Sequence, residues 1–212
     1  MNTNFLNKFI LASLVNLTKL TILDLYQNNL SGSIPIEIGY LSSLNELDLS
    51  FNSLNSSIPT SLGNLTSLSG LYLNENHISG SIPKEKGNLN SLYLLSLDDN
   101  NLSGPIPSDL ENQKNLVTMF LSVNHFIGSI PAFFGNLINL QYLYIQSNNL
   151  IEEIPSSICN LISLKVLYLG RNNLRGEILQ CLVNINGLWV LKIAYNNLNG
   201  EIPSSICNII SL

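Results

Sequence analysis

The chain has 212 residues, of which 45% are hydrophobic and only 11% are charged, and its formal net charge is −5. Binding to nucleic-acid phosphates needs a basic surface, so this charge balance excludes a nucleic-acid-binding function. No run of about 18 or more apolar residues occurs, so we expect no membrane-spanning segment in this chain. A chain so apolar and so poor in charge must bury its hydrophobic residues at regular intervals to avoid aggregation.

A period of 24 residues runs through the whole chain without insertions. Its first marker is a leucine that recurs at Leu20, Leu44, Leu68, Leu92, Leu116, Leu140, Leu164, Leu188 and Leu212. Such regularity predicts a stack of similar coils in a single repeat domain over residues 1–212. Residues 1–19 form a partial first coil, 20–211 form eight full coils, and 212 begins another. Solenoids carry polar caps at their ends, and we recognise none in this sequence.

The apolar–polar–apolar segment in each coil, first Leu23-Asp24-Leu25, predicts a short strand with its leucines pointing inward. Successive coils stack these strands in parallel about 4.8 Å apart, which builds one continuous sheet. One coil cannot bury its leucines alone, but its neighbours cover them. We therefore predict a solenoid of the α/β class that is mostly β, with a parallel sheet on its concave face and irregular or 3₁₀ return segments.

An asparagine follows each predicted strand at the point where the chain turns inward. Its side-chain amide is suited to pair with turn backbone groups that would otherwise be buried without partners. We interpret this column as a structural asparagine ladder and not as a catalytic array. Its members are Asn28, Asn52, Asn76, Asn100, Asn124, Asn148, Asn172 and Asn196.

Glycine and proline mark the return of each coil, and a few coils depart from this pattern. Ser56 and Glu152 stand where glycine is expected, and Leu179 stands where proline is expected. Lys86 and Gln113 occupy apolar positions of the return segment. A buried glutamine must find a hydrogen-bond partner or lower the stability. We expect local weak points at these positions and not binding sites.

A unit such as LTILDLYQNNLSGSIP, followed by a return such as TSLGNLTSL, resembles the plant-specific leucine-rich repeat. The resemblance covers essentially the whole chain. That family includes the ectodomains of plant receptor-like kinases and receptor-like proteins, and the polygalacturonase-inhibiting proteins. The resemblance implies a right-handed superhelix that binds a peptide, a co-receptor or another protein on its concave or lateral face.

Outward-facing residues of the predicted strands vary between coils while the framework does not. Acidic residues gather near the beginning of this face, and aromatic residues form a stripe toward its middle and end. An exposed aromatic patch is typical of an interface, although aromatic residues also suit strands and stack on one another. The candidate ligand-binding residues are Asp24, Glu46, Asp48, Tyr72, Phe120, Tyr142, Tyr144, Tyr168 and Lys192.

Three cysteines occur late in the chain, at Cys159, Cys181 and Cys207. Cys159 and Cys181 lie on the return segments of adjacent coils, so a disulfide between them would fit an oxidising compartment. Two buried free thiols explain the same residues equally well. Five glycosylation sequons, at Asn16, Asn29, Asn55, Asn64 and Asn101, agree with a secreted protein, although the repeat itself tends to produce them.

No catalytic or metal-binding motif appears, so we predict neither an enzyme nor a cofactor. His77 and His125 lie two coils apart, about 10 Å by strand spacing, which is too far to share a metal ion.

The predicted function is ligand recognition outside the cell by a plant cell-surface receptor involved in development or immunity, with a co-receptor of the same repeat class as a further partner. One alternative is a secreted enzyme inhibitor that resembles the polygalacturonase-inhibiting proteins. Another is a non-signalling scaffold or a truncated product. Without visible caps, we interpret the chain as a fragment of a larger ectodomain or as a truncated gene product.

Overall fold

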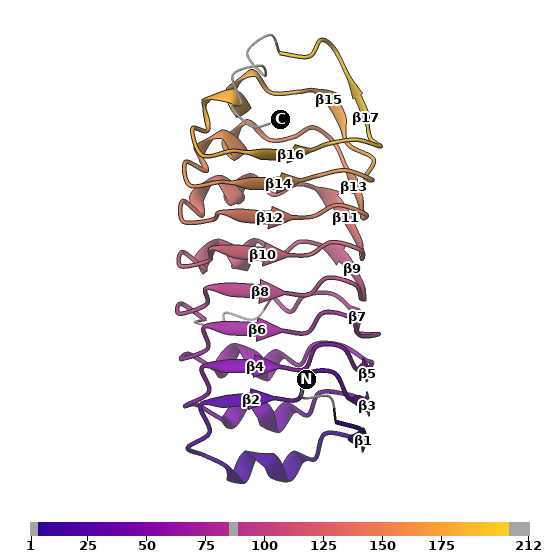
Figure 1. The fold of residues 1–212 in the computed structure, drawn as a ribbon, viewed down its shortest axis with the longest axis vertical. Helices are drawn as coiled ribbons and strands as arrows, with labels where there is room; N and C mark the ends of the chain where they lie inside the picture. Colours follow the sequence, from indigo (N-terminus) through magenta and orange to yellow (C-terminus); the bar gives the residue numbers. More distant parts are fainter. Residues whose placement is uncertain (1–3, 85–88, 204–212) are drawn as a thin grey trace.

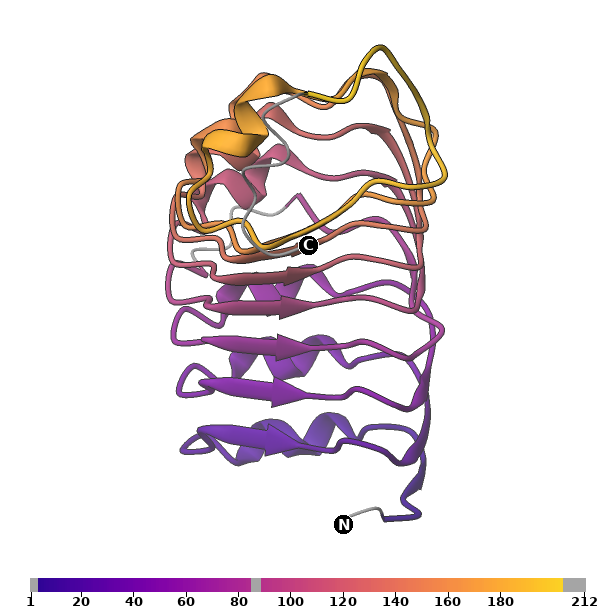
Figure 2. The ribbon, with the colours of Figure 1, turned by 45° about the horizontal axis from the view of Figure 1, so that its top comes forward.

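A computed structural model describes residues 4–84 and 89–203 as a stack of similar coils (Figure 1). The expected positions of Lys86, Cys207 and Leu212 lie outside the described residues. Short strands form one face, and short helical turns lie on the opposite side (Figure 2). The predicted solenoid is therefore confirmed.

Eight parallel strands, one from each coil, form the principal sheet within the described residues. Each has three residues, and each pairs with the strand 24 residues later, as in Leu23↔Leu47 and Leu143↔Leu167. The strands are β2 (Ile22–Asp24), β4 (Glu46–Asp48), β6 (Gly70–Tyr72), β8 (Leu94–Ser96), β10 (Thr118–Phe120), β12 (Tyr142–Tyr144), β14 (Val166–Tyr168) and β16 (Val190–Lys192).

Further strands follow the turn and form side sheets along one edge of the stack (Figure 1). They pair with a stagger of 22 residues, as in Ser79↔Asn101. In the described chain these strands are β1 (Asn7–Lys8), β3 (Asn29–Gly32), β5 (Ser53–Leu54), β7 (Ser79–Gly80), β9 (Asn101–Pro105), β11 (His125–Ser129), β13 (Asn149–Ile151), β15 (Arg175–Glu177) and β17 (Asn197–Asn199).

The side sheets are divided at the coils that carry Ser56 and Glu152 in place of glycine. One division lies between β5 and β7, and the other lies between β13 and β15, where an isolated bridge joins Glu153 and Arg175. Ser56 and Glu152 both adopt the left-handed backbone that glycine adopts in the other coils, with φ of 69° and 67°. A side chain at such φ values is strained, whereas glycine is not.

The return segments are 3₁₀ helices on the side opposite the principal sheet. Most begin directly after the proline of the Ile-Pro motif, whose extended backbone forms the N-terminal boundary, as at Pro35 and Pro131. Leu179 takes that place before η7 with the same extended backbone. In the described residues they are η1 (Ala12–Asn16), η2 (Ile36–Tyr40), η3 (Thr60–Asn64), η4 (Ser108–Asn112), η5 (Ala132–Asn136), η6 (Ser156–Asn160) and η7 (Gln180–Asn184).

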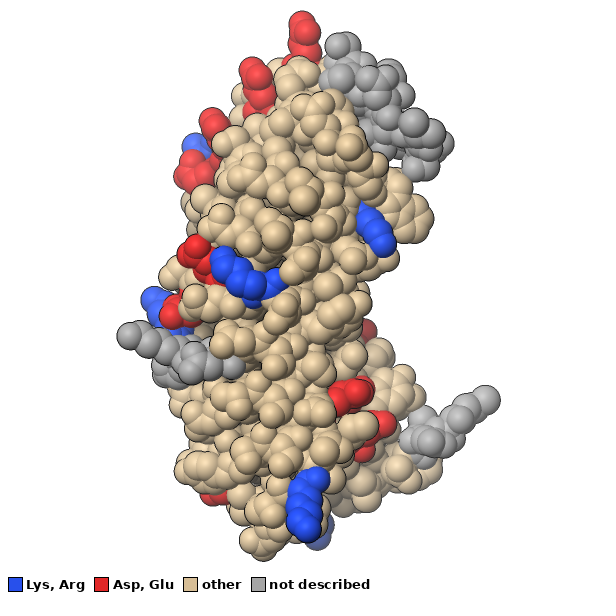
Figure 3. Space-filling view, turned by 90° about the vertical axis from the view of Figure 1, so that its left-hand side faces the viewer, with Lys and Arg blue, Asp and Glu red and all other residues tan. Residues whose placement is uncertain are grey.

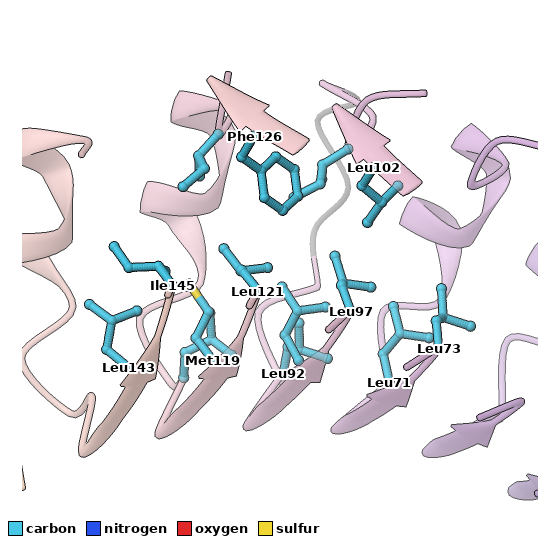
Figure 4. Close-up of a cluster of buried hydrophobic side chains, with 14 of the residues drawn as sticks. Leu71, Leu73, Leu92, Leu97, Leu102, Met119, Leu121, Phe126, Leu143 and Ile145 are labelled. Carbon is cyan, nitrogen blue, oxygen red and sulfur yellow. The ribbon is translucent and has the colours of Figure 1, made fainter. Parts of the chain in front are cut away.

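The core is a continuous column of apolar side chains between these layers. Inward leucines directly after the principal strands, such as Leu97 and Leu121, face Leu102 and Phe126 of the side strands (Figure 4). Phe126 and Phe134 are fully buried in the middle coils. Full burial of one such side chain contributes roughly 1.5–3 kcal/mol to the free energy of unfolding. Because the same apolar positions recur in every coil, their sum is the main source of stability.

Candidate ligand-binding face

The outward residues of the principal strands form a central column that runs along the solenoid. The strand register places Asp24 beside Asp48, Asp48 beside Tyr72, and Tyr72 beside Ser96. Onward from Ser96 the column continues through Phe120, Tyr144, Tyr168 and Lys192. The alternation of strand side chains therefore brings residues from eight coils onto one face.

Three aromatic rings in this column stack on one another and end at a cation. The ring centroids of Phe120 and Tyr144 lie 4.8 Å apart in an edge-to-face arrangement, and those of Tyr144 and Tyr168 lie 4.5 Å apart. Lys192 Nζ lies 4.4 Å from the centroid of the Tyr168 ring. All three rings are half-buried, so each presents one side to solvent. The pKa of the Tyr144 hydroxyl is raised by burial and by the neighbouring Tyr168 and Tyr142, while Lys192 opposes this change.

Tyr142 lies beside this stack, on the strand that carries Tyr144. Lys165 Nζ lies 6.0 Å from its ring centroid, so a second tyrosine–lysine pair adjoins the first. Gln146 follows two residues after Tyr144, and its Oε1 atom is shielded from solvent with no hydrogen-bond partner among the described residues. Sequence reasoning did not single out Gln146, because only the fold shows that this acceptor lacks a partner.

The predicted aromatic stripe has a gap between Tyr72 and Phe120 in the strand register. Ser96 lies between Tyr72 and Phe120 in the register and is buried. Tyr72 instead packs over Gly70, where an added Cβ would lie 3.0 Å from its ring. Tyr72 belongs with the acidic end of the face and not with the aromatic stack.

Glu46 and Asp48 lie on β4, directly beside the strand of Tyr72. The pKa of the Tyr72 hydroxyl is raised first by burial and then by the negative charges of Glu46 and Asp48. Asp48 also accepts hydrogen bonds from the Ser50 backbone N–H and hydroxyl, and Asp24 accepts one from the Tyr26 N–H. Asp24 and Asp48 thus stabilise local turns in addition to giving this end of the face its charge.

Charged side chains are scattered over a mostly uncharged surface on the side where the principal strands begin (Figure 3). Within residues 4–84 and 89–203, no group of three His, Cys, Asp or Glu residues is placed to hold a metal ion. No helix of the described chain is long and apolar enough to cross a membrane. The face of the principal strands therefore offers side chains for contact with a ligand.

The asparagine ladder occupies the interior of the turns. Asn100 Oδ1 accepts a hydrogen bond from the Ile78 N–H of the preceding coil, while its Nδ2 donates to Leu73, Leu97 and Asp98 carbonyls. The same Oδ1 contact, with a stagger of 22 residues, is made by Asn28, Asn52, Asn76, Asn124, Asn148, Asn172 and Asn196.

A left-handed residue precedes every ladder asparagine, and sequence reasoning missed this feature. Gln27, Asp99 and Val123 are examples, with φ of 52°, 51° and 53°. In every coil but the last, the N–H of this residue donates to a carbonyl of the next coil, as Val123 does to Gln146. No common residue type marks this column, so the pattern could not be found from composition.

Cys159 and Cys181 are joined by a disulfide with a Cα–Cα distance of 5.8 Å. It connects the return helices η6 and η7 of adjacent coils. The sequon residues Asn16, Asn29, Asn55, Asn64 and Asn101 are all exposed and lie away from the principal sheet.

Comparison with known proteins agrees with this architecture. Family models for the leucine-rich repeat match residues 138–198, and also 19–41, 43–65, 91–113 and 115–137. These models describe a structural repeat and not a catalytic domain. A comparison with curated proteins finds no significant match.

Several solved plant structures are similar to this chain. The ectodomain of the membrane receptor kinase GASSHO1/SCHENGEN3 from Arabidopsis thaliana, in complex with CASPARIAN STRIP INTEGRITY FACTOR 2, is 35% identical over 96% of this chain, with a TM-score of 0.92. The Arabidopsis receptor kinase HAESA, in complex with the peptide hormone IDA and the co-receptor SERK1, is 33% identical over 97%, with a TM-score of 0.90. The chain spans 24% and 38% of those two structures.

The fold alone does not fix the ligand. A plant ice-binding protein is also similar, at 27% identity over 93% of this chain and 71% of its own, with a TM-score of 0.73. The continuous repeats, the family models and the match to receptor ectodomains together show that the chain belongs to the plant leucine-rich repeat proteins and resembles the ectodomains of their receptor kinases.

Proposed function

We propose that this chain is a ligand-recognition segment of a plant cell-surface receptor and that it binds an extended peptide or protein loop outside the cell. The observation that carries the proposal is the stack of Phe120, Tyr144 and Tyr168, capped by Lys192. Half-buried aromatic side chains offer large apolar contact areas and have few rotatable bonds to restrict on binding, which makes them suitable interface anchors.

The charges on this face suggest how the ligand is oriented along the solenoid. Glu46 and Asp48 at one end favour basic groups of the ligand, whereas Lys165 and Lys192 at the other favour acidic or carboxylate groups. Asp48 and Phe120 are three strand steps apart, which is about 14 Å at about 4.8 Å a step. An extended chain rises about 3.3 Å per residue, so the ligand's basic residue would lie roughly four positions from its apolar anchor.

The similar receptor structures support this class of ligand. HAESA was solved with the peptide hormone IDA and the co-receptor SERK1, and GASSHO1/SCHENGEN3 was solved with CASPARIAN STRIP INTEGRITY FACTOR 2. By analogy, a co-receptor of the same repeat class is a second partner of the complete receptor. The same analogy supports a cell-surface location, because the GASSHO1/SCHENGEN3 structure is the ectodomain of a plant membrane receptor kinase.

A library of displayed random peptides, selected on the immobilised full chain, tests the proposal. Dissociation constants of the selected peptides are then measured for the wild type, for a Tyr144→Ala/Tyr168→Ala double variant and for Tyr40→Ala. Tyr40 is an exposed tyrosine on η2, on the opposite side of the solenoid.

We expect the double variant to weaken binding by about thirtyfold or more, since loss of an interface anchor costs about 2 kcal/mol or more. Tyr40→Ala should leave binding unchanged. Peptides with a basic residue should also weaken on Glu46→Gln/Asp48→Asn. Selected peptides that bind the double variant as tightly as the wild type would show that the stack is only structural. Failure to select any peptide, with tight binding of a secreted plant cell-wall hydrolase instead, would favour the inhibitor alternative.

A further inference from the structure

Five Asn-x-Ser/Thr sequons lie in the first half of the solenoid, on two different sides of it. Asn29 and Asn101 begin the side strands β3 and β9, and Asn55 directly follows β5. Asn16 and Asn64 are the last residues of the return helices η1 and η3. None of the five lies on the principal sheet, where the candidate ligand-binding residues are.

The amide nitrogen of each of these asparagines is available for modification. All five residues are exposed, and no hydrogen bond from their Nδ2 atoms is found within the part of the chain that the structure describes. Asn55 uses only its Oδ1, which accepts a hydrogen bond from Ser56 Oγ at 3.2 Å. The ladder residue Asn100, immediately before Asn101, is in contrast buried and donates three hydrogen bonds through Nδ2.

Two columns of exposed asparagines, one through Asn29 and Asn101 and the other through Asn16 and Asn64, continue into the second half of the chain. There the Ser or Thr two positions later, which completes a sequon, is absent. On the side sheets Ser31 and Ser103 give way to Ile151, Arg175 and Asn199. On the helical side Thr18 and Thr66 give way to Lys114, Ile138, Ile162 and Asn186. The corresponding asparagines are Asn149, Asn173 and Asn197 on the side sheets, and Asn112, Asn136, Asn160 and Asn184 on the helical side.

Isoleucines that replace these hydroxyl residues do not serve the core. Ile138 and Ile162 are 53% and 71% exposed, and Ile151 is 38% exposed. The same half carries the stack of Phe120, Tyr144 and Tyr168. In the half that holds the aromatic stack, exposed isoleucines therefore replace sequon hydroxyls both on the side sheets and on the helical side.

We propose that Asn16, Asn29, Asn55, Asn64 and Asn101 carry N-linked glycans, so that the partial first coil and coils one, two and four bear sugar while coils five to eight are bare. In the reaction, Nδ2 loses one proton and forms a C–N bond to the anomeric carbon of the oligosaccharide. The bond from that carbon to its lipid-diphosphate carrier breaks, and the diphosphate leaves with the electron pair. A glycan is bulky and hydrated, so it excludes protein contact where it is attached. The proposal does not depend on the ligand proposed above.

The full chain, secreted from plant cells behind a signal peptide, provides the test. Treatment with a peptide N-glycosidase in heavy-oxygen water converts each glycosylated asparagine into a labelled aspartate, which peptide mass spectrometry locates. We expect labels at the five sequons and none at Asn149 or Asn160. Ile151→Ser and Ile162→Thr create matched sequons at Asn149 and Asn160, which are exposed in the same two columns.

Each of these variants should gain one labelled site, which would show that only the missing hydroxyl keeps the second half bare. Absence of label at Asn29, Asn55 and Asn101, in a chain whose Ile151→Ser variant is labelled at Asn149, would overturn the proposal for the side sheets. Absence at Asn16 and Asn64, with label at Asn160 in Ile162→Thr, would overturn it for the helical side.

Discussion

Asn124 holds two coils together, because its Oδ1 accepts a hydrogen bond from the backbone N–H of Leu102 at 2.9 Å. Its Nδ2 donates to the carbonyls of Leu97 and Ser122 as well. Asn124→Ala would leave the buried Leu102 N–H without this partner, whereas the Leu97 carbonyl still accepts from Asn100 Nδ2 and the Ser122 carbonyl still accepts from the Asp99 N–H. An unpaired buried group costs about 1–3 kcal/mol, so we expect the free energy of unfolding to fall by about 1–3 kcal/mol, as measured by urea denaturation of the whole chain.

Asn149→Ala is the matched control for this variant, since Asn149 is exposed, lies in no sequon and makes no side-chain hydrogen bond among the described residues. Its stability should remain within about 0.5 kcal/mol of the wild type. Equal losses for the two alanine variants would contradict a structural role specific to the ladder.

Framework positions such as Leu23 and Asn124 could be predicted from the sequence, because packing demands the same residue type in every coil. The backbone of Val123 could not be predicted, since its left-handed φ is fixed by the turn geometry and not by its own preference. Cys159 and Cys181 are separated by 22 residues, two fewer than the period, so the spacing alone leaves a disulfide and two free thiols equally open. Similarly, a column of residue names does not reveal that the Tyr72 ring packs over Gly70.

Gln113→Leu should stabilise the chain. Gln113 is only 5% exposed, and its Oε1 has no hydrogen-bond partner among the described residues. Leucine occupies the same position in neighbouring coils, as at Leu137 and Leu161, both fully buried. Removing one unpaired buried polar atom should raise the free energy of unfolding by about 1–2 kcal/mol. Gln113→Glu should change stability in the opposite direction, because it buries a charge. An unchanged urea midpoint for the leucine variant would indicate that a water molecule already pairs with Oε1.

Ser56→Gly should also raise the stability. Ser56 has a φ of 69°, whereas the corresponding position of another coil is Gly104 with a φ of 79°. Relief of left-handed strain at a residue with a side chain is worth about 1 kcal/mol. The reciprocal variant Gly104→Ser should lose a similar amount, which thermal unfolding would detect as shifts of the midpoint in opposite directions. Shifts of the same sign would argue against backbone strain as the cause.

Cys159→Ser/Cys181→Ser should destabilise the late coils. The disulfide closes a loop with a sequence separation of 22 residues, and the chain-entropy model gives about 3 kcal/mol for a loop of this size. Urea unfolding without reductant measures the loss, and thiol titration of the denatured wild type shows whether the bond is present. Cys207→Ser is the control and should have little effect. A double serine variant as stable as the wild type would favour two free thiols.

The pKa of the Tyr72 hydroxyl reports on the charges at the acidic end of the face. Burial, Glu46 and Asp48 raise the pKa of its hydroxyl above the ordinary value of 10.0. Glu46→Gln/Asp48→Asn should therefore lower that pKa, although burial, the largest cause, keeps it above 10.0. Asp24→Asn, whose strand does not adjoin that of Tyr72, serves as the control.

The raised pKa also sets the sign of a pH dependence. The folded chain retains the Tyr72 proton at pH values where the unfolded chain has lost it. The stabilising contribution is thus complete below the unfolded pKa and is lost as pH rises through the folded pKa. Titration of the Tyr72 ring by NMR, together with unfolding above pH 10.0, should show a smaller alkaline loss of stability in the Glu46→Gln/Asp48→Asn variant. A Tyr72 pKa that does not move in this variant would mean that the two carboxylates lie too far from the ring to act on it or on a ligand beside it.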